Sequence, residues 1–136
     1  MRIFLDANVL FSGAKSDGAV RQLLKMLVQA GHECWVDGYV LEEARRNLAA
    51  KAPDHVAVLD TLHARWHVAP VLASQQELET TRWLPDKDRP VLAAAIRLRC
   101  AALVTGDRTH FGAAYGKSFG GVTIHSPQSL AQALLK

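Results

Sequence analysis

The sequence predicts an α/β sandwich built on a mostly parallel β-sheet, and two observations predict it. Short segments of strand character alternate with longer segments whose apolar residues recur at helical spacing. The strand segments are apolar throughout, which is typical of parallel strands that helices cover on both faces. With 136 residues, the chain is long enough for a hydrophobic core of its own, and we assign residues 1–136 to a single domain.

The first half of the chain is predicted to contain two strands and three helices. In chain order they are the strand 2–5, the helix 18–30, the strand 34–36, the helix 40–51 and a further helix that opens at Pro53. Apolar residues within 18–30 recur every three or four positions, and Gly31 is a natural stop for that helix. Pro53 ends the helix before it, because proline cannot continue the backbone hydrogen-bond pattern. No element is predicted between residues 6 and 17.

The second half is predicted to contain three strands and two longer helices. In chain order the elements are the strand 67–72, a short helical piece after residue 77, the helix from residue 90 to 98 or 99, the strands 102–104 and 122–124, and a last helix from residue 127. Ser74 and Glu77 have the spacing of a capping box. Pro90 fits the first turn of an alanine-rich helix, and Ser126 and Pro127 fit the N-cap and N1 positions of the last one.

Composition and charge narrow the class of protein only slightly. The net charge of +3 and the isoelectric point near 9.1 permit a nucleic-acid partner without identifying one. Cys34 and Cys100 fit no motif and lie in apolar surroundings, so we expect buried, reduced thiols. No apolar run is long enough to cross a membrane, and Asp6 interrupts the N-terminal apolar segment too early for a signal peptide. We therefore expect a cytoplasmic protein.

Four acidic residues are predicted to lie at one rim of the sheet. Asp6 and Asp107 each follow a predicted strand, whereas Glu43 and Asp88 lie at the N-terminal ends of predicted helices. Ligands of such sheets bind beyond the carboxyl ends of the strands, and the helices that return across the sheet begin near the same rim. The four carboxylates are therefore expected to converge.

Each acid also has an ordinary structural explanation. Asp6 and Asp107 fit simple turns, Asp88 fits a favourable interaction with a helix dipole, and Glu43 fits a solvated helix face. Together these explanations are weaker, because two carboxylates roughly 4 Å apart repel by about 4 kcal/mol at an effective dielectric constant of about 20. Protonation or a cation makes such a cluster tolerable, and an all-oxygen cluster suits Mg²⁺ or Mn²⁺.

Four segments resemble, in the same order, the four motifs of PIN-domain ribonucleases. They are FLDANVL, LEEARRNL, DKDRPVLAAAI and LVTGDRTHF, and GVTIHSPQSLAQALL is similar to the final strand and helix of that family. The resemblance spans almost the whole chain and is greatest to bacterial toxins of the VapC type from toxin–antitoxin systems. It implies a three-layer α/β/α sandwich and a metal-dependent endoribonuclease whose products carry a 5′-phosphate and a 3′-hydroxyl.

The resemblance also assigns roles to individual residues. The catalytic and Mg²⁺- or Mn²⁺-binding acids are Asp6, Glu43, Asp88 and Asp107, and the supporting polar residues are Asn8 and Thr105. Two positions leave an alternative open, because Glu42 adjoins Glu43 and Asp86 precedes Asp88 by two residues. Asp86 is otherwise expected to be a supporting acid outside the metal ligands.

Basic residues beside the acidic motifs are candidates for binding RNA phosphates, whose contacts position a strand without reading its sequence. They are Arg45, Arg46, Lys87, Arg89 and Arg108. For each of them the alternative is a solvated surface charge. His110 adjoins the expected site and is a candidate for substrate contact or for a capping or packing role. His63 and His67 have the spacing of a zinc pair but no evident third ligand.

The resemblance further implies an RNA substrate, a protein antitoxin as partner and pairing into a homodimer. The lack of a long apolar run predicts no membrane association. Two other functions stay open from the residues. One is a catalytically silent PIN-like module that binds RNA or another protein. The other is an Asp-dependent phosphoryl-transfer domain, which Asn8 disfavours because it stands where an Asp-x-Asp phosphatase motif has its second acid.

Overall fold

A six-stranded sheet forms the centre of the protein in the computed structural model, which describes residues 1–71 and 78–135. The strands are β1 (Arg2–Leu5), β2 (Glu33–Asp37), β3 (His67–Ala69), β4 (Ala102–Val104), β5 (Ser118–Phe119) and β6 (Val122–His125). They are ordered β3-β2-β1-β4-β6-β5. All pairs are parallel except β5 with β6, so the predicted, mostly parallel sheet is confirmed.

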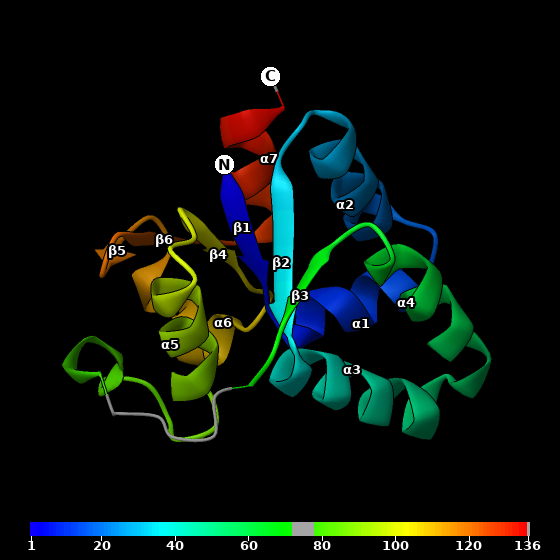
Figure 1. Ribbon diagram of the computed structural model, residues 1–136, viewed down its shortest axis with the longest axis horizontal. Coiled ribbons are helices and arrows are strands. Elements are labelled where there is room, and N and C mark those ends of the chain that lie inside the picture. The colour runs from blue at the N-terminus through cyan, green and yellow to red at the C-terminus, as the bar shows by residue number, and fades with distance from the viewer. Residues whose placement is uncertain (72–77, 136) are drawn as a thin grey trace.

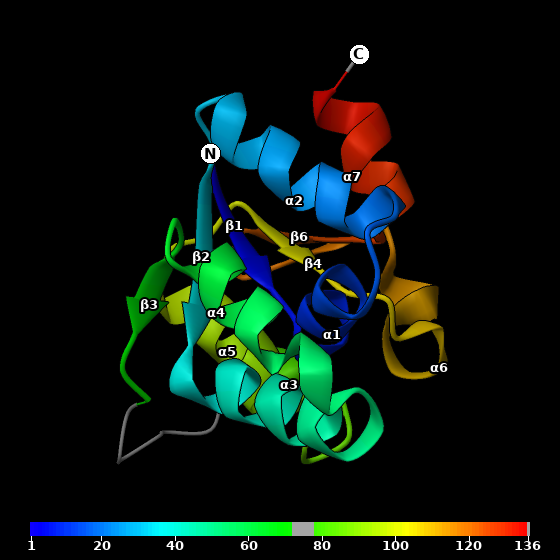
Figure 2. The same ribbon diagram turned by 90° about the vertical axis from the view of Figure 1, so that its right-hand side faces the viewer.

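Helices cover both faces of this sheet. They are α1 (Ala7–Lys15), α2 (Ala19–Gln29), α3 (Gly38–Lys51), α4 (Val56–His63), α5 (Arg89–Arg97), α6 (Arg108–Phe111) and α7 (Pro127–Leu134), with 3₁₀ turns at Pro53–His55, Glu79–Thr81 and Gly112–Ala114. The helices α1 to α4 lie on one side of the strands and α5 on the other (Figures 1 and 2). The expected three-layer α/β/α sandwich is confirmed.

Most predicted elements have the expected bounds. Gly31, which has φ +87°, follows α2 and ends it, as glycine commonly does where a chain leaves a helix through the left-handed region. Ser126 caps α7 through a capping box with Ser129. The predicted strand 67–72 is shorter than expected, since β3 ends at Ala69 and Pro70 has no N–H to donate. The Ser74–Glu77 capping box lies outside the described residues.

The helix α1 is the main element that the sequence analysis did not predict. Asp6 begins it, because its carboxylate accepts a hydrogen bond from the Ala7 N–H, 2.8 Å away. The buried residues of α1 recur at helical spacing; they are Ala7, Val9, Leu10, Gly13 and Ala14. The expectation of a turn after β1 was therefore incomplete, because the residue that leaves the strand is also the N-cap of a helix. The short elements α6 and β5 were not predicted either.

The core lies between the sheet and the two helical layers. Every residue of β4 is buried, as are the last three residues of β1, which confirms strands buried on both faces. Cys34 and Cys100 are buried free thiols, and burial raises the pKa of each to about 12. No helix in residues 1–71 and 78–135 is long and apolar enough to cross a membrane.

The strand order reverses between β1 and β4, and this junction positions the candidate site. From β1 the chain proceeds to β2 and β3 on one side, and from β4 to β6 on the other. At the carboxyl end of the junction, the Asp6 N–H donates to the Val104 carbonyl, 3.1 Å away. A crevice opens beyond the strands at such a reversal, because the connections leave in opposite directions.

Candidate active site

An open pocket of about 240 Å³ lies at this crevice. All four predicted acids line it, and they are Asp6, Glu43, Asp88 and Asp107. They come from four separate parts of the chain: the end of β1, the helix α3, the start of α5 and the loop after β4. The structure thus brings together the carboxylates that the sequence analysis expected to converge.

Asp6 is the most tightly held of the four acids. It is only 4% exposed. Its Oδ1 accepts from the Ala7 N–H at 2.8 Å, and its Oδ2 accepts from the Thr105 hydroxyl at 2.8 Å and from the Asn8 amide at 3.3 Å. These bonds fix the orientation of the carboxylate relative to both β1 and β4.

Asn8 and Thr105 join the two loops that follow β1 and β4. The Asn8 Oδ1 accepts from the Gly106 N–H at 2.7 Å, and the Thr105 Oγ1 accepts from the Asp107 N–H at 3.1 Å. The Thr105 carbonyl in turn accepts from the Tyr115 hydroxyl at 2.8 Å. Both residues therefore occupy positions from which they orient acids through hydrogen bonds, as the expected supporting role requires.

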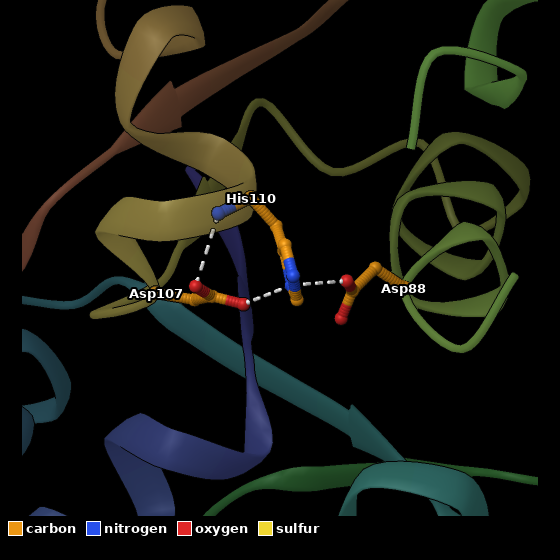
Figure 3. Close-up of side chains that lie close together, drawn as sticks. All are labelled: Asp88, Asp107 and His110. Atoms are coloured by element: carbon orange, nitrogen blue, oxygen red, sulfur yellow. Dashed lines mark hydrogen bonds and ion pairs between the residues drawn. The ribbon is translucent and has the colours of Figure 1, made fainter. Parts of the chain in front are cut away.

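Asp88 occupies the N-cap position of α5 but makes no capping hydrogen bond with its side chain. Its carboxylate faces the His110 ring (Figure 3), and its Oδ2 lies 2.8 Å from the His110 Nδ1. Both atoms are buried, and neither has a hydrogen-bond partner of good geometry in the described part of the chain. The Asp88 side chain therefore does not cap α5 by a hydrogen bond, while its position at the start of the helix still fits a favourable interaction with the helix dipole.

Asp107 caps a helix and also faces the pocket. Its Oδ1 accepts from the His110 N–H at 3.1 Å and so begins α6. Its Oδ2 lies 2.8 Å from the His110 Nδ1, the same atom that Asp88 approaches (Figure 3). One ring nitrogen carries at most one proton, so His110 cannot donate well to both carboxylates at once.

Tyr39, in the first turn of α3, holds the loop before α5 against the pocket. Its hydroxyl donates to the Lys87 carbonyl at 2.7 Å. Burial raises the pKa of Tyr39, and the negative charges of Glu43, Asp88 and Asp6 raise it further. This hydroxyl therefore stays protonated and keeps the Asp88 loop close to the helix that carries Glu43.

Electrostatics favour a cation in the pocket. Burial raises the pKa of Asp6 to about 6; its hydrogen bonds from Thr105 and Ala7 oppose this rise, and the charges of Asp88 and Glu43 add to it. Burial also raises the pKa of Asp88, where Asp107 adds to the effect and the charges of His110 and Lys87 oppose it. The cluster holds excess negative charge, and a divalent cation among carboxylate oxygens would balance it. The donor set therefore fits Mg²⁺ or Mn²⁺.

The raised pKa of Asp6 predicts how stability depends on pH without metal. Because the folded protein binds this proton more tightly than the unfolded chain, which titrates near 3.8, the contribution is fully present below about pH 4. It is lost as the pH rises through about 6, and it amounts to about 3 kcal/mol at 1.36 kcal/mol per pKa unit. Urea unfolding in EDTA at pH 4.5 and 7.5 should show about 2 kcal/mol of this loss in the wild type and much less in Asp6→Asn, since part of the contribution is already lost at pH 4.5. Identical pH dependence in both proteins would contradict the assignment.

The structure also separates the acids between which the sequence left a choice. Glu43 and Asp88 line the pocket, whereas Glu42 and Asp86 are not among its described lining residues. The Asp86 side chain is 94% exposed, and its carboxylate pairs with Arg89 at 2.9 Å. Asp86 is thus placed at the surface beside the site.

The predicted RNA-binding residues differ in their surroundings. Lys87 lines the pocket, whereas Arg45 forms an ion pair with Asp60 of α4. Arg89 donates to the Leu84 carbonyl at 2.8 Å and so helps to hold the loop before α5. The other two, both exposed, are Arg46 and Arg108. A role of these five residues in RNA binding stays a prediction.

Three residues that line the pocket were not predicted as site residues. They are Phe11, Asn47 and Lys51. Asn47 and Lys51 follow Glu43 at successive four-residue steps of α3, a spacing that places all three on one helix face and could have identified them. Phe11 belongs to α1, and without that helix its position could not be inferred.

Comparisons with known proteins agree with this arrangement. A family model described as PIN domain matches residues 2–109 of the chain. No curated protein sequence matches it. A similar fold occurs in VapBC2 from Rickettsia felis bound to a DNA fragment from their promoter, with 15% identity, a TM-score of 0.65 and coverage of 93% of this chain and 98% of that chain.

Two further solved structures share the fold. VapBC-1 from nontypeable Haemophilus influenzae has 14% identity and a TM-score of 0.61, over 94% of this chain and 99% of that chain. VapC20 from Mycobacterium tuberculosis, a toxin that cleaves the sarcin–ricin loop, has 14% identity and a TM-score of 0.57, over 86% of this chain and 98% of that chain. At these identities the similarity shows a common fold.

Proposed function

The chain belongs to the PIN domain family, and on that premise we propose that it is a divalent-metal-dependent endoribonuclease that cleaves RNA phosphodiester bonds. The observation that carries this proposal is the convergence of Asp6, Glu43, Asp88 and Asp107 in one pocket at the reversal of strand order. Four carboxylates in one partly buried cluster repel one another and so lower stability, and a metal-dependent nuclease site would explain why they are kept together.

The four acids would hold Mg²⁺ or Mn²⁺ through carboxylate oxygens. When bound, the ion lowers the pKa of a coordinated water molecule and neutralises charge that develops on the scissile phosphate. The protein supplies the fixed geometry: Thr105, Asn8 and the Ala7 N–H orient Asp6, and the capping bond to the His110 N–H orients Asp107. One of the carboxylates would accept the proton of the attacking water.

An RNA-cleavage assay tests this proposal. Purified protein should cleave single-stranded RNA with Mn²⁺ or Mg²⁺, leave 5′-phosphate ends, and lose all activity in EDTA. Activity that persists in EDTA would contradict a metal-dependent mechanism. RNA binding without cleavage in either metal would instead support the catalytically silent module.

We further propose that this nuclease acts in the cytoplasm as the toxin of a toxin–antitoxin pair. The proposal draws on the similarity of its fold to VapBC2, to VapBC-1 and to the VapC20 toxin. A neighbouring gene for a small antitoxin would support it, and purification of a complex with that protein would test it directly. Pairing into a homodimer stays a prediction from the family resemblance.

A further inference from the structure

A line of pocket residues leads along α3 away from the acids. Glu43, Asn47 and Lys51 stand at four-residue steps on one face of that helix, and all three line the pocket. At a rise of 1.5 Å per residue, the backbone positions of Glu43 and Lys51 are about 12 Å apart. The lining therefore changes from acid to amide to cation over a distance that extends beyond the metal ligands.

The helix α1 packs beside α3 (Figure 2). Its residue Phe11 adds an aromatic ring to this line. Phe11 is partly exposed and also lines the pocket. The Lys15 and Lys51 ammonium groups lie 5.5 Å and 5.7 Å from the centre of its ring. Neither lysine forms an ion pair with an acid among the residues that the structure describes. Both charges are thus available to a ligand.

We propose that these residues, Phe11, Lys15, Asn47 and Lys51, form a strip that binds single-stranded RNA next to the scissile phosphate. The inference rests on the proposed function, in which the acidic pocket acts on RNA. The pocket's carboxylates repel phosphates, so a strand that enters it needs positive charge close by, and the two lysines provide that charge at one end.

The ring of Phe11 makes an unpaired strand the expected ligand. An aromatic side chain between cations can stack with a base once the lysines turn to the flanking phosphates, and stacking requires that the base be unpaired. The Asn47 amide lies between the acids and Lys51, where it can donate a hydrogen bond to a phosphate or ribose oxygen. The strip therefore favours a strand over a duplex and tolerates different bases.

Fluorescence anisotropy with a labelled single-stranded RNA, in EDTA so that no metal is present, tests the strip. Lys51→Ala should weaken binding about tenfold and reduce the slope of log K against log salt by about 0.7, the value for one lost phosphate contact in single strands. Lys25→Ala is the matched control, since Lys25 borders a separate hollow between α2 and α4, and it should change neither quantity. Lys51→Arg should retain both the wild-type affinity and the wild-type salt slope.

The aromatic part has its own test. Phe11→Leu should weaken binding several-fold without a change in the salt slope, and Phe11→Trp should retain the affinity, because stacking is independent of counterion release. Thermal melting of each variant checks that it is folded. If Phe11→Leu does not fold, the affinity of Phe11→Trp still tests the role of the aromatic ring.

The outcomes distinguish this inference from the proposed function. If the wild type cleaves RNA but Lys51→Ala and Lys25→Ala bind RNA equally well, the strip is overturned and the proposed nuclease function stands. RNA binding that depends on Lys51, in a protein that does not cleave RNA, would support the strip and contradict the proposed nuclease function. No RNA binding, or binding to a duplex as tight as to a single strand, would overturn the strip.

Discussion

Asp6→Asn is expected to abolish Mn²⁺-dependent RNA cleavage and to stabilise the metal-free protein. Removal of a residue that hydrogen-bonds to a metal ligand commonly lowers metal affinity or activity 10- to 100-fold. Loss of a residue that binds the metal itself should therefore lower activity at least about a hundredfold. The neutral amide avoids the burial cost that raises the pKa of Asp6 to about 6, but its NH2 group replaces an oxygen that accepts hydrogen bonds. The free energy of unfolding at pH 7.5 should therefore rise by less than about 3 kcal/mol. Asparagine also caps helices well, so α1 is retained.

Asp86→Asn is the matched control for this prediction. It removes the same charge from an exposed acid two residues from Asp88. Cleavage rates with Mn²⁺ and urea unfolding in EDTA should both match the wild type in that variant. Full activity of Asp6→Asn would exclude Asp6 from the site, and a loss of activity as large in Asp86→Asn would show that general surface charge is being measured.

Asp107→Asn is expected to weaken metal binding while it preserves the fold. Asparagine can still accept the capping bond from the His110 N–H, so the melting temperature without metal should be nearly unchanged. With Mn²⁺ at about a hundred times its dissociation constant, binding should raise the free energy of unfolding of the wild type by about 2.7 kcal/mol. A tenfold loss of affinity reduces this gain to about 1.4 kcal/mol.

Thermal melts with and without Mn²⁺ measure this difference, and RNA cleavage should fall in parallel. Equal stabilisation by Mn²⁺ and equal cleavage in the two proteins would leave Asp107 with only its capping role. The prediction thus separates the two contacts that Asp107 makes, one to the backbone of α6 and one toward the pocket.

Local patterns were sufficient to predict most of the fold. Apolar runs identified β1 and β4 because both strands are buried on their two faces, and Pro90 marked the start of α5 because proline fits the first turn of a helix. The helix α1 was missed because Asp6 satisfies the description of a turn residue and of an N-cap equally well. Sequence spacing cannot decide between these roles without knowing where the next buried residues pack.

The convergence of the four acids in one pocket was predictable from the sequence, whereas the residues around them were not. Asp6 and Asp107 follow strands, so topology alone places them at one rim. The choice of Glu43 over Glu42 follows from the rotation of α3, which turns neighbouring residues about 100° apart. Lys51 and Phe11 become neighbours only when α1 and α3 pack, and the position of His110 between two acids depends on the approach of α5 to α6. Such contacts between distant segments cannot be predicted from local sequence patterns.

The hydrogen bond between Thr105 and Asp6 joins residues 99 positions apart, and this separation has a consequence for synthesis. The ribosome makes the chain from its N-terminus, so Asp6, Glu43 and Asp88 emerge before the loop that completes their pocket. The strand β4, which lies beside β1, must also be made before the central part of the sheet can close. A nascent chain that ends before Asp107 contains no complete site, so a nuclease of this design would be inactive until the loop after β4 has been made.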